Sequence, residues 1–588
     1  MNNIKNMLSR LTLPFIIVTA TLWLTACSTT KLEKINEPIS NNNITKKINV
    51  PRSQKLPNTI LPIKTALDSN RERKAEKLHS DLLLSLLSPE ERIYYEILGA
   101  EIAWRKGDFS LMDDHLALLK GEIPLALILK RFGGEPTSLI KLAFRKLKTS
   151  PTNTERIALR KILWSSLLKL KSSELSEILS DTADSEFIAW LNLAQLINST
   201  YPLDLHKILS NLPISAFNYP TLKPLPGGLE ELLIESKRDN FFRVALFLPL
   251  SGRLRPASEA IRDGFLEAYF YARDQYKNSA IYIFDTTKYK NISEAYSAAN
   301  KIGADYVVGP LEKRHVSSLK KMNSLPIPTL ALNRSSEEIL EKPLELNQLS
   351  LSPTDEAMQI ARIAFTKGFR KSIIISPQDA WGRKMRDTVA TTWSKLGGKI
   401  LAKVELGDPS TYSDSLEKIL HLKQSKARAI EANKITGSSL NFQLRRRQDL
   451  DVIFLLAGSF EQARSIAPLL KFHFAGDIPK YATSKIYYGL RDERNPDLNG
   501  ITLVDMPEVL NSPHLIRKND EITGNSNSLR LHALGLDAFI VQYFLNLHDA
   551  KNELVFLGHS GLISIQDNSQ ILREAITGEF VDGKLVRK

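Results

Sequence analysis

The sequence predicts an α-helical N-terminal region followed by an α/β domain with two lobes. Three observations lead to this prediction. Amphipathic helical patterns follow one another up to about residue 235, a strand–loop–helix unit begins at Arg243, and alternating strands and helices then fill two successive sets. At 588 residues the chain is too long for a single hydrophobic core, so several domain-sized units are expected.

The strand–loop–helix unit covers residues 243–272. Residues 244–250 form an almost unbroken apolar run, as expected of a strand buried on both faces of a parallel sheet. Ser251 and Gly252 end the run, and Pro256 suits the first turn of a helix. Apolar residues then recur at helical spacing and include Ile261, Gly264 and Phe265 in one stripe. The unit therefore opens a doubly wound fold.

The same alternation continues through residues 240–588. Further strands are predicted at 281–285, 305–310, 328–333, 372–376, 399–406, 452–457 and 480–484. Helices are predicted at 292–302, 312–323, 354–367, 381–396 and 460–470. Short links between strands and helices require parallel sheets with right-handed crossovers. Because the alternation restarts after residue 353, we expect two lobes with a cleft between them.

Residues 59–235 are predicted to form a helical domain. Within residues 91–119 a helix ends near Trp104, the sequence Gly107-Asp108-Phe109 makes a turn, and a second helix returns, which is similar to a tetratricopeptide helix pair. Further helices are predicted at 155–170, 186–197 and 203–212. A strict 34-residue period is not visible, so a generic helical bundle is the alternative. Three prolines and two glycines within residues 219–228 predict the domain boundary.

The N-terminus predicts export and lipid attachment. Lys5 and Arg10 precede an apolar run of 14 residues, which at about 1.5 Å per residue is too short to span a bilayer core of about 30 Å. The run ends in Leu-Thr-Ala-Cys, which looks like a lipobox, so residues 1–26 are predicted to be a signal peptide and Cys27 the lipidated residue. A plain signal peptide with an incidental cysteine is the alternative. Residues 27–58 are polar and are expected to form a flexible tether.

Composition limits the function classes. Cys27 is the single cysteine, which excludes a disulfide within the chain and any cysteine-based metal or redox motif. The formal net charge of +14 permits an acidic partner, but no basic helix with interleaved aromatic residues indicates a nucleic-acid binder. No histidine spacing or nucleophile motif indicates a metal site or catalysis. We therefore expect a protein that is not an enzyme and that uses no cofactor or metal.

Several segments together resemble one family. They are FLPLSGRL, GADYVVGPL, LSPTDEA, SPQDAWGRKM, RRRQDLDVIFLLAG, IPKYATSKIY and DLNGITLVDMP. These segments, in order after a lipobox and a helical region, resemble the LppC/LpoA-type lipoproteins, whose α/β part has the type I periplasmic-binding-protein fold. The resemblance implies an outer-membrane activator of a bifunctional class A penicillin-binding protein that stimulates peptidoglycan cross-linking. In lipoproteins of this kind, Ser28 directly after Cys27 implies the outer membrane.

A candidate cleft follows from the positions of polar residues after strands. Open α/β sheets bind ligands at the carboxyl ends of their strands, where Ser251, Gly252, Ser352, Asp355 and Asp379 are expected, together with the Gly309-Pro310 pair. Each has a structural alternative, because Ser251 and Gly252 suit a turn, and Ser352 and Asp355 suit a helix N-terminus. A pairing of Asp355 with Asp379 for hydrolysis cannot be judged from sequence separation.

A second candidate is a partner contact at Arg445, Arg446 and Arg447. These arginines belong to a basic insertion, residues 423–451, that is predicted to be a solvated loop. The sequence Gly558-His559-Ser560-Gly561 lacks the spacing of a nucleophile elbow and is predicted to link two short strands. His473, His532 and His559 are predicted to be structural.

Three functions remain as hypotheses at this point. The first is the penicillin-binding-protein activator that the resemblance implies. The second is a periplasmic receptor that binds a small solute in the cleft. The third is a wall hydrolase, which would turn over purified sacculi by itself.

Overall fold

The computed structural model describes a defined set of residues. They are 59–68, 71–105, 111, 115, 136–149, 153–212, 218–235, 242–272, 279–335, 343–437, 442–489, 495–511, 526–547, 554–565 and 571–588. The predicted signal peptide, the predicted lipidation site Cys27, the whole predicted tether and the predicted turn at 107–109 lie outside the described residues.

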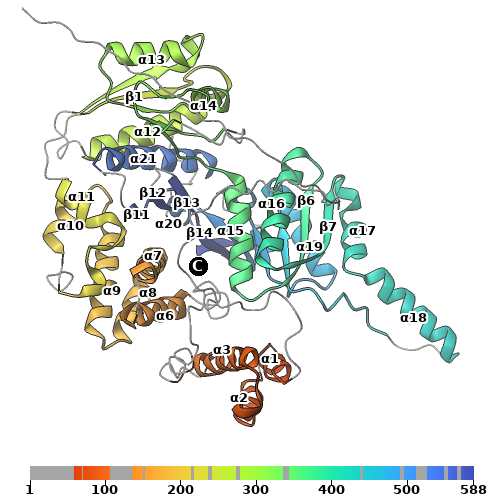
Figure 1. Ribbon diagram of the computed structural model, residues 1–588. Coiled ribbons are helices and arrows are strands. Elements are labelled where there is room, and N and C mark those ends of the chain that lie inside the picture. The colour runs from red at the N-terminus through yellow and green to blue at the C-terminus, as the bar shows by residue number, and fades with distance from the viewer. Residues whose placement is uncertain are drawn as a thin grey trace, which may run out of the picture. The chain divides into compact units, whose positions relative to one another are not determined.

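The N-terminal region is helical, as predicted (Figure 1). Its helices are α1 (Leu61–Asp68), α2 (Glu72–Ser80), α3 (Pro89–Arg105), α6 (Pro136–Thr149), α7 (Asn153–Lys169), α8 (Ser172–Ser180), α9 (Ser185–Ser199), α10 (Leu205–Asn211) and α11 (Leu229–Glu235). Side-chain caps define some of their starts. Asp184, for example, precedes α9 and accepts hydrogen bonds from the backbone N–H groups of Glu186 (3.0 Å) and Phe187 (3.1 Å).

Two hydrophobic cores lie in this helical region. Helices α1 to α3 bury a small core that includes Ile60, Leu67 and Leu98. Helices α6 to α11 instead share a large core with parts of the α/β domain. At that junction the indole N–H of the buried Trp164 donates to the carbonyl oxygen of Val555 at 3.3 Å.

The proline-rich segment 218–228 contributes to this large core. It forms two short 3₁₀ turns, Pro220–Leu222 and Pro226–Gly228, in which Leu222 and Pro226 are buried. The guanidinium of Arg160 donates to the carbonyl oxygens of Thr221 and Pro224. Gly227 has a φ of +66°, and a Cβ atom there would lie 2.3 Å from the Trp164 ring. Glycine is therefore required both for the backbone conformation and for the close approach of the indole.

The first lobe of the α/β domain contains a five-stranded parallel sheet. Its strands are β1 (Arg243–Leu248), β2 (Ala280–Asp285), β3 (Tyr306–Val308), β4 (Thr329–Ala331) and β5 (Leu346–Gln348), in the order β2-β1-β3-β4-β5. Its helices are α12 (Arg255–Ala272), α13 (Ile292–Lys301) and α14 (Lys313–Lys320). This is a doubly wound strand order, and it confirms the predicted strand–loop–helix unit.

The second lobe repeats this order and then departs from it. The strands β6 (Lys371–Pro377), β7 (Lys399–Leu406), β8 (Val452–Leu455), β9 (Lys480–Ala482) and β10 (Ile501–Asp505) are parallel in the order β7-β6-β8-β9-β10. Two antiparallel strands, β14 (Ile576–Val581) and β15 (Lys584–Arg587), extend the sheet beyond β10. The strands predicted in this lobe are parallel as expected, and the C-terminal hairpin, which was not predicted, adds antiparallel strands to the edge that β10 leaves open.

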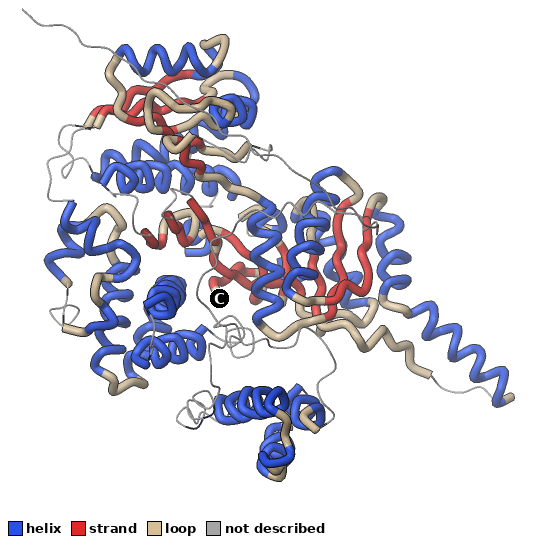
Figure 2. The backbone as a smooth tube through the Cα atoms, in the orientation of Figure 1, coloured by secondary structure: helices blue, strands red, loops and turns tan. Residues whose placement is uncertain are grey.

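Helices flank the second sheet (Figure 2). They are α15 (Pro353–Thr366), α16 (Ala380–Leu396), α17 (Tyr412–Ile419) and α19 (Phe460–Phe472). Helix α18 (Leu422–Thr436) instead projects away from the sheet, and the short helix α20 (Pro507–Asn511) follows β10 (Figure 1). The prediction of a solvated loop at 423–451 is wrong for its first part, which forms α18. Lysine, alanine, glutamine and isoleucine are compatible with a helix, and their polar pattern gave no apolar face from which to predict one.

The remaining elements return to the first lobe. Helix α21 (Ser526–Leu547) packs against α12, and β11 (Leu554–Leu557), β12 (Leu562–Ile565) and β13 (Ile571–Glu574) form a small antiparallel sheet. The two helices approach closely at glycines. A Cβ atom on Gly264 of α12 would lie 2.1 Å from the carbonyl oxygen of His532, and one on Gly535 of α21 would lie 2.1 Å from that of Ile261.

Candidate functional site

The predicted cleft residues of the first lobe form a turn that satisfies its own polar groups. Gly252 has a φ of +72°, a conformation that favours glycine. The hydroxyl of Ser251 donates to one Asp285 carboxylate oxygen at 2.9 Å, and the N–H of Leu250 donates to the other at 3.0 Å. Burial opposes ionisation of Asp285, but hydrogen bonds from Thr287 and Ser251 outweigh it and lower the pKa of this carboxyl. The structural alternative accounts for both predicted residues.

The predicted cleft residues of the second lobe lie at two separate helix N-termini. Ser352 precedes α15, and its hydroxyl lies 2.6 Å from that of Thr354. Asp355 in the first turn of α15 accepts from Arg334 at 2.7 Å. Asp379 caps α16 by accepting from the N–H of Gly382 at 2.6 Å. Asp355 and Asp379 thus bind different groups, and no hydrogen bond in the described structure joins them as a catalytic pair.

A buried ion pair was not predicted from the sequence. Arg530 of α21 donates to both carboxylate oxygens of Asp505, at 2.5 and 2.9 Å, and both side chains are almost fully buried. Arg530 also donates to the carbonyl oxygens of Ser484 and Tyr487 at 3.1 Å. Burial would lower the pKa of Arg530, but the charge of Asp505 and the bonds to it raise it instead. The guanidinium therefore ties the end of β10 to α21 and to the segment after β9.

Glu356 lies in the same polar region. Its carboxyl accepts hydrogen bonds from the N–H (3.0 Å) and the hydroxyl (3.1 Å) of Ser484. Burial raises the pKa of Glu356, and the positive charge of Arg573 opposes the change. Arg573 in turn donates to the carbonyl oxygen of Ser560 at 2.6 Å. These contacts are those of a structural polar network, because each charged group is already bonded inside the fold.

Asp537, His559 and Ser560 bring together the residue types of a hydrolase without its geometry. The Ser560 hydroxyl donates directly to Asp537 at 2.5 Å, and the His559 ring instead faces Glu508, with Nδ1 at 2.8 Å from its carboxylate. Ser560 is fully buried. In a Ser-His-Asp site the serine needs a hydrogen-bonded imidazole as its base and access to substrate, and this arrangement has neither. Residues 558–561 link β11 and β12, which confirms the predicted loop.

Burial and neighbouring charges together shift the pKa values of Asp537 and His559. Burial raises the pKa of Asp537 although His559 and Ser560 oppose it. For His559 burial acts to lower the pKa, but the hydrogen bond to Glu508 and the charge of Asp537 outweigh it and raise the pKa. A sequence signal for this network did exist. Arg530 and Asp537 are seven residues apart in a largely apolar helix and so lie on one face.

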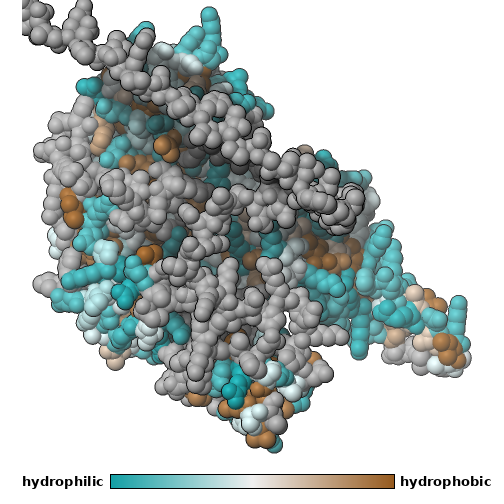
Figure 3. All heavy atoms as spheres, viewed as in Figure 1, coloured by the Kyte–Doolittle hydropathy of each residue, from teal (hydrophilic) through white to brown (hydrophobic). Residues whose placement is uncertain are grey.

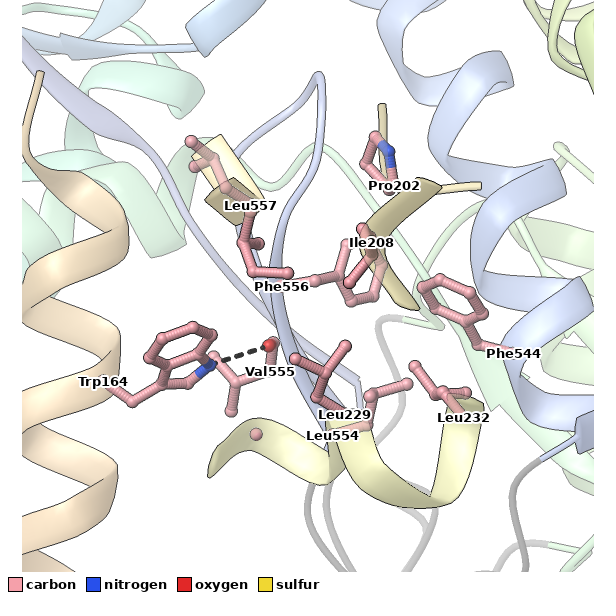
Figure 4. Close-up of a pocket in the computed structure, with 12 residues that line it drawn as sticks. Trp164, Pro202, Ile208, Leu229, Leu232, Phe544, Leu554, Val555, Phe556 and Leu557 are labelled. Atoms are coloured by element: carbon pink, nitrogen blue, oxygen red, sulfur yellow. Dashed lines mark hydrogen bonds between the residues drawn. The ribbon is translucent and has the colours of Figure 1, made fainter. Parts of the chain in front are cut away.

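A small, partly open hollow lies between the helical region and the α/β domain (Figure 4). It has a volume of about 30 Å³ and is lined almost entirely by apolar side chains. These include Trp164, Leu229, Leu232 and Phe544, and the bond from Trp164 to Val555 closes one side. A hollow of about this size has room for little more than a water molecule and is too small for a cofactor.

A larger hollow is an open groove between α15 and α16. Its volume is about 630 Å³, and its lining carries the cations Arg362, Lys384 and Lys395 together with Asp387. Such a surface attracts an acidic segment through solvent-screened charges. Among the described residues, no group of three or more His, Cys, Asp or Glu side chains is placed to hold a metal ion. Within the same residues, no helix is both long and apolar enough for a transmembrane span.

The three predicted partner-contact arginines lie at the base of α18 and differ in their contacts. Arg446 pairs with Asp477 at 2.7 Å and donates to the carbonyl oxygen of Phe474. Arg447 pairs with Asp449 at 2.7 Å, and its hydrogen bond lowers the pKa of that carboxyl to about 2. Arg445 is exposed, and its backbone N–H donates to Ser425 at 3.1 Å. Two of the three guanidinium groups are thus held within the fold.

Comparison with known proteins places the chain in a family. A family model described as "LppC putative lipoprotein" matches residues 140–583. A relative named penicillin-binding protein activator LpoA from Photobacterium profundum is 28% identical over 426 residues, which are 70% of this chain and 68% of the relative. A relative of the same name from Vibrio cholerae is 25% identical over 547 residues, 88% of each chain.

The chain is also similar to solved structures. The crystal structure of full-length LpoA from Haemophilus influenzae is 18% identical, with a TM-score of 0.45, and the match covers 90% of this chain and 88% of that one. The family match spans most of the described residues, including both lobes of the α/β domain. This chain therefore belongs to the LppC family.

Proposed function

We propose that this chain is a lipid-anchored outer-membrane protein that docks directly on a bifunctional class A penicillin-binding protein and stimulates its cross-linking of peptidoglycan. The alignment with a relative named as a penicillin-binding protein activator carries this proposal, because it covers 88% of both chains. The aligned length is greater than that of the α/β domain, so the match is not limited to one lobe.

The contacts of the described residues support a scaffold more than a receptor or a hydrolase. A receptor needs polar groups free to bind a solute, whereas Ser251, Asp355 and Asp379 are already bonded to Asp285, Arg334 and Gly382. A hydrolase needs an accessible acid and base, whereas Asp537 is fully buried. These polar groups shape the fold, and the proposed activity belongs to the partner's active site.

A protein that catalyses no reaction can activate an enzyme only by binding two of the enzyme's conformations with different affinities. The chain has to bind the active conformation of the synthase more tightly than its resting conformation, because only a difference in affinity shifts the equilibrium. A tenfold shift requires a difference of about 1.4 kcal/mol. A few well-placed surface contacts can supply this difference.

The activation is tested with purified proteins. The chain, without residues 1–26, is mixed with the class A penicillin-binding protein of the same organism and its lipid-linked substrate, and cross-linked muropeptides are counted. We expect cross-linking to rise severalfold and to saturate as the concentration of the chain increases. The chain alone, with the same substrate, is the control and should produce no cross-links. Unchanged cross-linking at saturating concentrations would contradict the proposal.

The anchor is tested by replacing Cys27 with alanine. Because acyl chains on Cys27 are the proposed anchor, Cys27→Ala should move the protein from the membrane fraction to the soluble periplasmic fraction. Immunoblots of separated inner-membrane, outer-membrane and soluble fractions measure the change. In the purified assay the same variant should still activate the synthase. A Cys27→Ala protein that stays in the outer-membrane fraction would rule out this anchor.

A further inference from the structure

Helix α18 has almost no packing of its own. After Leu422 at its start, no side chain of the helix is buried. Ile430 is 48% exposed and Ile435 is 79% exposed. A helix of about 15 residues is marginal in water without tertiary contacts. A surface helix in a folded domain normally buries an apolar stripe, and among the described residues α18 does not.

One face of α18 carries three lysines around a single isoleucine. Lys423, Lys426, Ile430 and Lys434 are spaced i, i+3, i+7 and i+11, which places them in one stripe about 16 Å long. We call these four residues the lysine stripe. Each of them is exposed. Glu431, the single acidic residue of the helix, lies roughly 100° round the axis from Ile430.

The lysines of the stripe are available for a partner. Lys423 lies 3.7 Å from the Glu417 carboxylate of α17, a long contact at the start of α18. Lys426 and Lys434 form no ion pair with any residue that the structure describes. By contrast, Arg446 and Arg447 at the base of the helix are paired with Asp477 and Asp449. Apart from the exposed Arg445, the accessible positive charge of the insertion therefore lies on α18 among the described residues.

We propose that the lysine stripe is a docking surface for an acidic patch on the penicillin-binding protein. This proposal rests on the proposed function and assigns one contact surface to it. The charge of the stripe selects a negatively charged partner, and Ile430 supplies an apolar contact at its centre. The exposed lysines speed the encounter with an acidic surface, and their effect is screened by salt.

The same helix is poorly suited to a membrane surface. A helix that lies in a lipid interface needs a broad continuous apolar face. Ile430 and Ile435 are five residues apart, so they point roughly 140° away from each other. Figure 3 shows a largely hydrophilic surface over α18 with isolated hydrophobic residues. A protein surface with carboxylates fits this pattern better than lipid does.

The test reverses the charge of the stripe in the full-length chain. The variant Lys423→Glu/Lys426→Glu/Lys434→Glu and the wild type are compared for binding to the immobilised penicillin-binding protein at low and physiological salt. We expect roughly a tenfold or greater loss of affinity at low salt, mostly as a slower association rate, with the salt dependence largely removed. The variant Lys423→Gln/Lys426→Gln/Lys434→Gln should lie between the two. Circular dichroism checks that the helix content is unchanged.

A matched control changes three exposed lysines of the first lobe. Lys288→Glu/Lys290→Glu/Lys301→Glu makes the same change in net charge and should reduce affinity much less. If the wild type binds and the stripe variant binds equally well, or if both charge reversals weaken binding equally, the stripe is not the docking surface although the proposed function stands. If the wild type does not bind at all, the docking function and this partner both fail. Binding to phosphatidylglycerol vesicles that is lost in the stripe variant, with synthase binding unchanged, would instead assign the stripe to lipid and overturn the proposal.

Discussion

Replacing Asp505 with alanine is expected to lower the free energy of unfolding of the α/β domain by about 3–5 kcal/mol. The Asp505 side chain has no solvent exposure, and that of Arg530 is 8% exposed. Removal of the carboxylate leaves a guanidinium buried without its counter-charge. The cost of an unpaired buried charge far exceeds the net value of the pair. Urea unfolding followed by tryptophan fluorescence measures the change.

Two further variants separate this effect from a general loss of contacts. Asp387→Ala removes a carboxylate that pairs with Arg386 and is 61% exposed, and it should cost at most about 1 kcal/mol. The double variant Asp505→Leu/Arg530→Met removes both charges and should be more stable than Asp505→Ala. If Asp505→Ala unfolds at the same urea concentration as the wild type, the pair does not hold α21 to β10.

Replacing Gly264 with alanine is expected to destabilise the contact between α12 and α21 by about 3 kcal/mol. The intrinsic helix propensity of alanine favours this substitution by about 1 kcal/mol. The added Cβ atom, however, would lie 2.1 Å from the backbone carbonyl oxygen of His532, which cannot move without shifting α21. The clash therefore decides the sign of the effect. Thermal unfolding of the variant measures it.

Gly458→Ala provides the matched control for this prediction. A Cβ atom at Gly458 would make an ordinary contact, with its nearest neighbour at 3.5 Å. This substitution should change stability by less than about 1 kcal/mol. Gly535→Ala, which meets Ile261 from the other helix, should be as harmful as Gly264→Ala. The two effects should not add, since both report the same contact. A Gly264→Ala protein as stable as the Gly458→Ala control would refute the close approach.

The candidate cleft residues illustrate what local sequence can predict. Ser251 and Gly252 are compatible with a turn, and Ser352 and Asp355 with a helix start, and these local roles are the ones that the structure displays. Capping and turn chemistry depend on neighbours within a few residues, so the residue types alone carry the information. Whether such residues also face a ligand depends on distant segments, and the sequence left that alternative open.

The arginine cluster and α18 show the opposite case. The positive charge of residues 423–451 is evident from the sequence, but the sequence does not show which of these side chains form ion pairs and which stay exposed. Asp477 neutralises Arg446 from 31 positions away, whereas Lys426 and Lys434 are left exposed. Ion pairs over such separations depend on how α18, α19 and the returning segment pack, which no local pattern encodes.

Local periodicity by itself determined the alternation of strands and helices from Arg243 onward and the helical character of the N-terminal region. Three features depend on the tertiary structure alone. Helix α21 packs on α12, Arg530 forms an ion pair with Asp505, and the side chains of α18 after Leu422 are not buried. The physical reason is that local patterns involve residues close in sequence, whereas packing partners are distant in sequence. A hydrophobic stripe specifies that a face must be buried, but the partner that covers it is chosen by competition among all such faces in the folded chain.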